Sequence, residues 1–118
     1  MSSPTTRTLK LLRDRGYMAQ VVERWCSFTK RRHDLFGIID VLAIKDGKTL
    51  AVQTTSGSGY SARLKKMLAS DTLMPMLDAG WHVHLHGWRK VKVKRGGKAM
   101  RWEVRELDLR EKTDCKNE

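Results

Sequence analysis

The chain has 118 residues, with 24 lysines and arginines against 13 aspartates and glutamates, and a formal net charge of +11 at pH 7. This length fits one domain. The positive charge favours a polyanionic partner, bound with an affinity that falls as salt increases. Nucleic acid is the first expectation, and a ribosome-like or membrane surface is the second. Cys26 and Cys115 show no metal-binding spacing, and no apolar run reaches the roughly 18 residues of a membrane span. We therefore expect a cytoplasmic protein with free thiols, without a membrane partner.

The N-terminal part of the sequence predicts one helix. Residues 1–4, like the polar tail at about 111–118, are expected to be disordered. Thr5 or Thr6 can cap a helix that continues to Arg15 with apolar residues at helical spacing, and the glycine that follows provides a C-terminal stop.

A strand is predicted from Tyr17 to Trp25, followed by a basic loop. Glu23 in this strand is either an acid of a functional site or the surface partner of a neighbouring arginine. Lys30, Arg31 and Arg32 in the loop are expected to contact phosphate groups, because arginine suits bidentate phosphate binding. The alternative is a solvated loop.

The segment that follows predicts a β-hairpin with an acid inside it. The Asp-Gly pair at positions 46 and 47 favours a two-residue turn between two apolar, β-branched runs. The register that this turn sets places Asp40 directly opposite Gln53 and puts Thr55 on the same face. These three side chains are therefore expected to lie together.

Asp40 requires a partner, because both runs are otherwise apolar on both faces and a carboxylate is costly there unless it is paired or binds a cation. One interpretation is an acid neutralised by a lysine or arginine, or one at the wet end of a strand. The other is a site for a hard cation such as Mg²⁺ or Mn²⁺, with Asp40 and the carbonyl of Gln53 as ligands.

In this hairpin the sequence resembles the PD-(D/E)XK nucleases, a superfamily that includes the Holliday junction resolvases. The resemblance rests on Gly37 and Asp40 in G-I-I-D and on Gln53 and Thr55 in V-Q-T-T. The family usually has Glu or Asp where Gln53 stands and Lys where Thr55 stands. Glu23 would supply a further acid that resolvase-like members carry on their first helix.

The resemblance implies a restriction-endonuclease-like core and a metal-dependent hydrolysis of phosphodiester bonds. In that scheme Asp40 is the main ligand of Mg²⁺ or Mn²⁺ and Gln53 the second, while Thr55 positions water or phosphate. Because resolvases act as dimers, a homodimer is a further expectation.

A helix is predicted from about Tyr60, after a flexible segment at 56–59 whose serines can cap it. Its N-terminus is expected to point toward the hairpin acids, because it follows directly from the second strand. Its basic residues are expected to bind nucleic acid: Arg63, which has the shortest reach to the site, with Lys65 and Lys66.

Pro75 predicts a break in this helix and then a short second helix. The alternating segment from Trp81 predicts a strand with His82, His84 and His86 on one face. These histidines are either a polar sheet face or ligands of Zn²⁺.

The alternation continues into a cationic hairpin. Lys90, Lys92 and Lys94 share one face and are expected to follow a phosphate backbone, and Trp88 or Trp102 could stack on bases. The alternative is an edge ribbon that lysine protects from aggregation.

Together these elements predict one α/β domain in the order α-β-β-β-α-β-β, with a mixed sheet flanked by helices. The expected function is that of a metal-dependent DNA nuclease. Two other classes stay open: a nucleic-acid-binding module that keeps the scaffold without the chemistry, and an assembly protein whose basic face meets an acidic partner.

Overall fold

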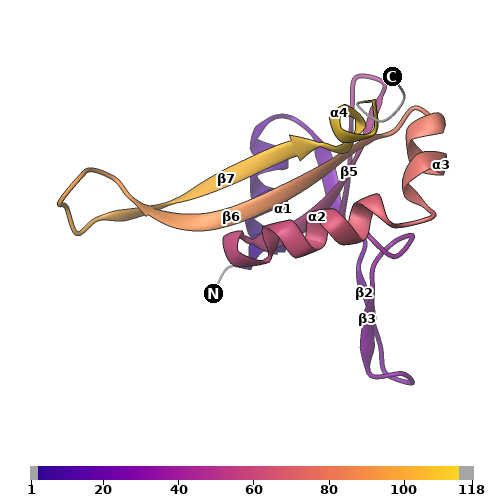
Figure 1. Ribbon diagram of the computed structural model, residues 1–118, viewed down its shortest axis with the longest axis horizontal. Helices are drawn as coiled ribbons and strands as arrows, with labels where there is room; N and C mark the ends of the chain where they lie inside the picture. Colours follow the sequence, from indigo (N-terminus) through magenta and orange to yellow (C-terminus); the bar gives the residue numbers. More distant parts are fainter. Residues whose placement is uncertain (1–2, 115–118) are drawn as a thin grey trace.

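The computed structural model describes residues 3–114, and its sheet is built around the predicted hairpin (Figure 1). β4 (Val41–Lys45) and β5 (Lys48–Ser56) pair antiparallel through a tight turn in which Asp46 and Gly47 both have positive φ, 50° and 80°. Turns of this hand match the twist of the strands that they join. The expected register is confirmed up to the last ladder pair, Val41 with Val52.

The five-stranded sheet has the order β1-β4-β5-β6-β7 and is mixed. β5 and β6 run parallel because two helices carry the chain back between them, whereas the other neighbours are antiparallel. The predicted α/β class and the mixed sheet flanked by helices are therefore confirmed. The remaining elements are α1 (Pro4–Asp14), β1 (Met18–Val21), β2 (Arg24–Cys26), β3 (Arg31–His33), a short 3₁₀ turn (Gly57–Gly59), α2 (Tyr60–Leu68), α3 (Leu73–Asp78), β6 (His82–Lys92), β7 (Met100–Asp108) and α4 (Leu109–Asp114).

The two faces of the sheet bury different helices. On one face, Leu12 of α1 packs with Val41 and Val52 of the central strands. On the other face, α2, α3 and α4 pack against residues of β5 and β6, among them Ala51 and Leu85. Because side chains alternate along a strand, each residue of β5 belongs to one of these two layers.

The first helix begins earlier than expected. Ser3 is the N-cap and its hydroxyl accepts a hydrogen bond from the Thr6 amide at 3.2 Å, and Pro4 occupies the first turn, where its missing N–H costs nothing. The expectations of a cap at Thr5 or Thr6 and of disorder over residues 3 and 4 are therefore wrong.

The chain also remains folded beyond the point where we expected a disordered tail. Leu109 is fully buried at the start of α4, and Arg110 donates a hydrogen bond to the carbonyl oxygen of Leu77 at 2.8 Å. α4 includes residues 111–114 of the expected tail. The rest of that tail, with Cys115, lies outside the described residues, as do residues 1 and 2.

The predicted strand from Tyr17 to Trp25 is instead two strands in two different sheets. β1 pairs with β4, but the chain then leaves the main sheet, and β2 pairs only with β3 in a separate two-stranded ribbon (Figure 1). We call this ribbon, residues 24–33, the arm. The expected basic loop at residues 30–32 is thus partly the second strand of the arm.

The helical crossover follows the prediction in outline. α2 and α3 are separated by a break near Ser70, as Pro75 and the polar residues before it indicated. The N-cap of α2 is Gly59, which makes no side-chain hydrogen bond, so the expected serine caps are wrong. A Cβ at Gly59 would lie 2.6 Å from Thr55 Oγ1, so glycine is needed for this approach of α2 to β5.

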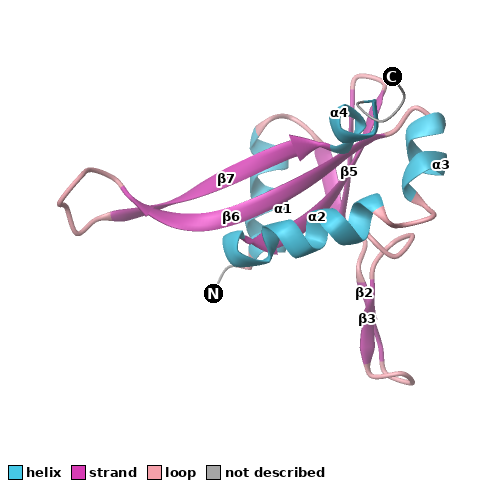
Figure 2. Ribbon diagram, viewed as in Figure 1, coloured by secondary structure: helices cyan, strands magenta, loops and turns pink. Residues whose placement is uncertain are grey.

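β6 and β7 extend past the sheet as a long twisted hairpin, and the arm projects in another direction (Figure 2). The molecule therefore has two protruding β-ribbons on a central α/β body. Among the described helices, none has the length and apolarity needed to cross a membrane.

Candidate functional site: a carboxylate pocket

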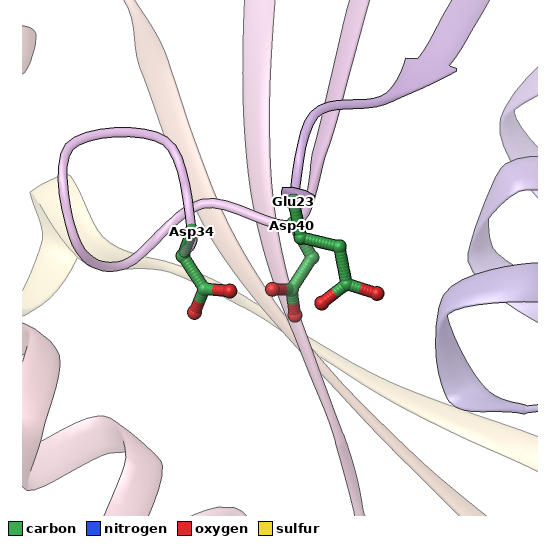
Figure 3. Close-up of side chains that lie close together, drawn as sticks. All are labelled: Glu23, Asp34 and Asp40. Carbon is green, nitrogen blue, oxygen red and sulfur yellow. The ribbon is translucent and has the colours of Figure 1, made fainter. Parts of the chain in front are cut away.

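Three carboxylates meet where the arm joins the sheet. Glu23 directly precedes β2, Asp34 directly follows β3, and Asp40 directly precedes β4. One oxygen from each lies within 4.8 Å of the others, and the three side chains point into the same space (Figure 3). Because the arm is an antiparallel ribbon, its two ends are side by side, and this brings Glu23 and Asp34 together at its base.

Asp40 is the most buried of the three, with 5% of its surface exposed. Its Oδ2 accepts hydrogen bonds from the backbone amide and from the hydroxyl of Thr54, both at 3.0 Å. Burial raises the pKa of Asp40 to about 7, although the Thr54 amide opposes the shift, and the nearby carboxylates of Asp34 and Glu23 raise it further. Ionisation of Asp40 is therefore unfavourable unless a cation lies close to it.

Gln53 connects Asp40 to the guanidinium of Arg63. It is 1% exposed, and its amide oxygen and nitrogen both find hydrogen-bond partners in only one of the two amide orientations. In that orientation the nitrogen donates to the Ile38 carbonyl oxygen at 2.5 Å and to Asp40 Oδ2 at 3.2 Å, while the oxygen accepts from Arg63 Nη1 at 3.2 Å. The expected contact between Asp40 and Gln53 is confirmed. The carbonyl that we expected to face a metal instead holds Arg63.

The carboxylates lie in a pocket of about 510 Å³ that other elements complete. The N-terminus of α1, the end of β5 and the first part of α2 all contribute to its wall. Arg63 and Lys66 bring positive charge to the same space. The lining residues are Ser3, Pro4, Thr5, Glu23, Asp34, Asp40, Gln53, Thr54, Thr55, Ser56, Arg63 and Lys66.

Thr54 and Thr5 form a second layer of support that sequence reasoning did not identify. The Thr54 hydroxyl donates to Asp40, so it accepts from the Thr5 hydroxyl, 2.9 Å away. Thr5 lies on α1 and Thr54 faces that helix. The position of Asp40 is therefore tied to both layers of the fold.

The pocket contains every side chain that we predicted to be catalytic: Asp40, Gln53, Thr55 and Glu23. Asp34 was missed as a site residue. The only signal for it in the sequence is its place directly after a basic run, and an acid in a connecting segment is usually solvated. Its position depends on the arm returning to its starting point, which local patterns do not reveal.

The predicted nucleic-acid-binding cations lie in three places. Arg63 and Lys66 line the pocket, whereas Lys65 is exposed on α2 away from it. Lys30 and Arg31 are exposed on the arm, and the side chain of Arg32 lies outside the described part of the structure.

The third group of cations belongs to the long hairpin. Lys90, Lys92 and Lys94 are all exposed, and Lys90 Nζ lies 5.6 Å from the centre of the Trp102 ring. None of these three lines the carboxylate pocket.

The three histidines of β6 are not brought together as a set of metal ligands in the described part of the chain. Among the described side chains, Glu23, Asp34 and Asp40 are the only set of three or more His, Cys, Asp or Glu with ligand atoms this close. His86 is fully buried beneath α1 instead of lying on a solvated face, and its Nδ1 is 3.1 Å from Thr8 Oγ1. The expectation of a polar, solvated sheet face is therefore wrong for His86, whereas His82 and His84 are partly exposed.

The two tryptophans proposed to stack on bases have different surroundings. Trp88 is buried and donates from Nε1 to Thr8 Oγ1 at 2.8 Å, so it is not available for stacking. Trp102 is 42% exposed, but the guanidinium of Arg7 covers one face of its ring at 3.4 Å. The expectation is wrong for Trp88 and restricted for Trp102.

Comparison of the sequence with models of known protein families and with curated proteins found no match.

Proposed function

We propose that the protein is a metal-dependent phosphodiesterase that acts on nucleic acid, with DNA as the expected substrate. The observation that carries this proposal is the convergence of Glu23, Asp34 and Asp40 within 4.8 Å, in a pocket that also holds Arg63 and Lys66. Acids and cations that line one pocket suit a phosphate group bridged to a metal ion.

The donor set fits a hard divalent cation. Carboxylate oxygens are the ligands that Mg²⁺ and Mn²⁺ prefer, and no thiolate or imidazole belongs to this group of described side chains. A neutralising cation also accounts for the placement of Asp40, whose ionisation burial and its acidic neighbours otherwise disfavour. Glu23, Asp34 and Asp40 would hold the ion, and Gln53 is a further ligand only if its amide turns.

When bound, the ion supplies a Lewis acid that polarises the phosphate and lowers the pKa of its water. The chain supplies the remaining charge. Gln53 holds Arg63 at the pocket wall, where its guanidinium can bind a phosphate oxygen, and Lys66 adds a second positive charge. Thr55 contributes a hydroxyl at the end of β5 that can orient the phosphate or a water.

The order of elements supports the resemblance to the PD-(D/E)XK nucleases. A first helix is followed by three antiparallel strands of the main sheet, β1, β4 and β5, and α2 then leads to the parallel strand β6. The arm is an insertion between the first two of these strands. We propose that the body of the protein is a restriction-endonuclease-like core.

The proposal is tested by measuring Mn²⁺ binding calorimetrically and the cleavage of labelled DNA for the wild type and Asp40→Asn. The variant keeps the shape of the side chain and an acceptor for Thr54 but removes a ligand charge. We expect weaker Mn²⁺ binding and cleavage reduced by about 100-fold or more. The matched control is Asp14→Asn, an exposed acid of α1 that pairs with Lys10 outside the pocket. Unchanged Mn²⁺ binding and cleavage in Asp40→Asn would contradict the proposal.

A non-catalytic nucleic-acid-binding module is the second candidate, and one observation favours it. Gln53 and Thr55 are neutral where the resembled family is charged, and the Gln53 carbonyl is already engaged by Arg63. The double variant Gln53→Glu, Thr55→Lys separates the two candidates. If the wild type and this variant both bind DNA without cleaving any substrate, the module is the correct function.

A further inference from the structure

The arm exposes aromatic side chains that the body of the protein does not cover. Trp25 is 60% exposed and Phe28, in the loop at the tip, is 93% exposed. β2 and β3 form their own two-stranded sheet, which projects away from the main sheet (Figure 1). Phenylalanine has no polar atom to solvate at such a position, so its exposure favours a binding role.

The charge of the arm selects the chemistry of the partner. Residues 24–33 contain four lysines and arginines and no aspartate or glutamate. Arg24, Lys30 and Arg31 are exposed on the same ribbon as the two aromatic residues. Exposed rings and exposed cations on one surface element are typical of proteins that bind single-stranded nucleic acid, where the rings stack on bases and the cations contact phosphates. The same charge opposes association of two arms from two copies of the chain.

The base of the arm connects this surface to the carboxylate pocket. A groove of about 580 Å³ runs along residues 20–24 and 33–36, and Glu23 and Asp34 line both this groove and the pocket. A volume of this size falls in the range of ligand-binding clefts. A nucleic-acid strand held by the arm would therefore lie next to the three carboxylates.

We propose that the arm is a binding surface for unpaired nucleotides, with Trp25 and Phe28 stacking on exposed bases. A ring on a protruding ribbon can reach the face of a base only where that base is unpaired, because the faces of paired bases are covered within the duplex. Stacking reads the face of a base and not its edge, so this surface discriminates unpaired from paired nucleotides without reading sequence. This inference rests on the proposed function for the chemistry that the arm serves.

Fluorescence anisotropy in EDTA tests the arm without any contribution from a metal. The probes are a labelled DNA duplex with a single-stranded gap and the same duplex fully paired. We expect the wild type to prefer the gapped probe, and Trp25→Ala and Phe28→Ala each to weaken binding to it by roughly tenfold, with less than about a twofold change on the paired probe.

Trp102→Ala is the matched control, because it removes an exposed tryptophan from the other ribbon and should leave the preference intact. Thermal melting checks that the arm variants remain folded, which we expect because both side chains project into solvent.

Three results would overturn the inference: equal affinity of the wild type for both probes, an unchanged preference in both arm variants, or loss of the preference in Trp102→Ala alone. Analytical ultracentrifugation adds a fourth. If the arm variants convert a dimer to a monomer and leave DNA binding unchanged, the arm is an interface between copies. If the protein prefers the gapped probe but cleaves no DNA, the proposed function is contradicted and the inference about the arm stands. If it cleaves DNA but does not prefer the gapped probe, the inference about the arm is contradicted and the proposed function stands.

Discussion

Two carboxylates of this protein, Asp40 and Glu106, have opposite electrostatic surroundings. Glu106 lies 3.4 Å from His86 Nε2 and receives a bidentate hydrogen bond from Arg15, at 2.7 and 3.0 Å. His86 and Arg15 hold the pKa of Glu106 well below its ordinary value, although partial burial acts against them. Asp40 instead faces two other acids, and its pKa is raised.

The difference separates an acid that is neutralised within the folded chain from one that folding leaves beside other acids. Glu106 finds its cationic partner within the chain, so folding itself neutralises it. Asp40 accepts a hydrogen bond from Thr54, but the carboxylates of Glu23 and Asp34, which lie within 4.8 Å, carry charge of the same sign. A carboxylate whose raised pKa reflects burial together with other acids is a candidate for function.

The largest effect expected from this comparison is on stability at alkaline pH. The pKa of Asp40 is raised above its unfolded value, so the folded state binds more protons between about pH 4 and pH 7, and stability falls as pH rises through that range. Asp40→Asn removes this loss. We expect the variant to be more stable than the wild type at pH 8, by at most about 4 kcal/mol, and similar at pH 4.

Urea denaturation at pH 4, 6 and 8 measures this difference. Added Mn²⁺ should raise the stability of the wild type at pH 8 and that of Asp40→Asn much less, because in the proposed site the ion binds only the folded state and does so through the ionised carboxylates. An Asp40→Asn protein that is less stable than the wild type at pH 8 would show that Asp40 is a structural acid like Glu106.

Arg63 provides a test of the pocket on its cationic side. Its guanidinium is held by Gln53, and in the proposed mechanism it neutralises charge that develops on the phosphate. We expect Arg63→Ala to reduce kcat by about 100-fold while changing DNA affinity by only a few fold. Lys65→Ala, on the same helix but outside the pocket, is the control. Equal losses of kcat and of affinity would assign Arg63 to general phosphate binding.

Glu106→Gln should act in the opposite direction from Asp40→Asn. The pKa of Glu106 is depressed, so its contribution is present above the unfolded pKa near 4.5 and is lost as pH falls below it. Because the ion pair with Arg15 is partly exposed and screened, we expect a loss of about 1 kcal/mol at pH 7 and almost none at acidic pH. Denaturation curves at two pH values decide this, and a stabilised variant would refute the comparison.

The smallest effect concerns the long β6–β7 hairpin. Replacing Lys90 and Lys92 by alanine removes two exposed charges that lie outside the pocket, so we expect a modest and uniform loss of DNA affinity. The logarithmic salt dependence of binding should become less steep by up to about 2, and kcat should not change. A salt dependence that does not differ from that of the wild type would show that this ribbon makes no phosphate contacts.

Local patterns in the sequence were sufficient for the central hairpin and for the contact inside it. A turn at Asp46 and Gly47 leaves little choice of register, and the two-residue alternation then fixes which side chains share a face. Asp40 and Gln53 were predicted to be neighbours for this reason. The α/β class followed from the same kind of signal, because hydrophobic periodicity depends only on nearby residues.

Only the tertiary structure determined which side chains the residues of the pocket and of β6 contact. Asp34 joins the site because the arm folds back on itself, and His86 is buried because α1 covers a face of β6 that the sequence presents as polar. The orientation of the Gln53 amide depends on Arg63, which belongs to a helix of the other layer. Each of these outcomes depends on contacts between segments distant in sequence, whereas alternation and turn signals report only on neighbours.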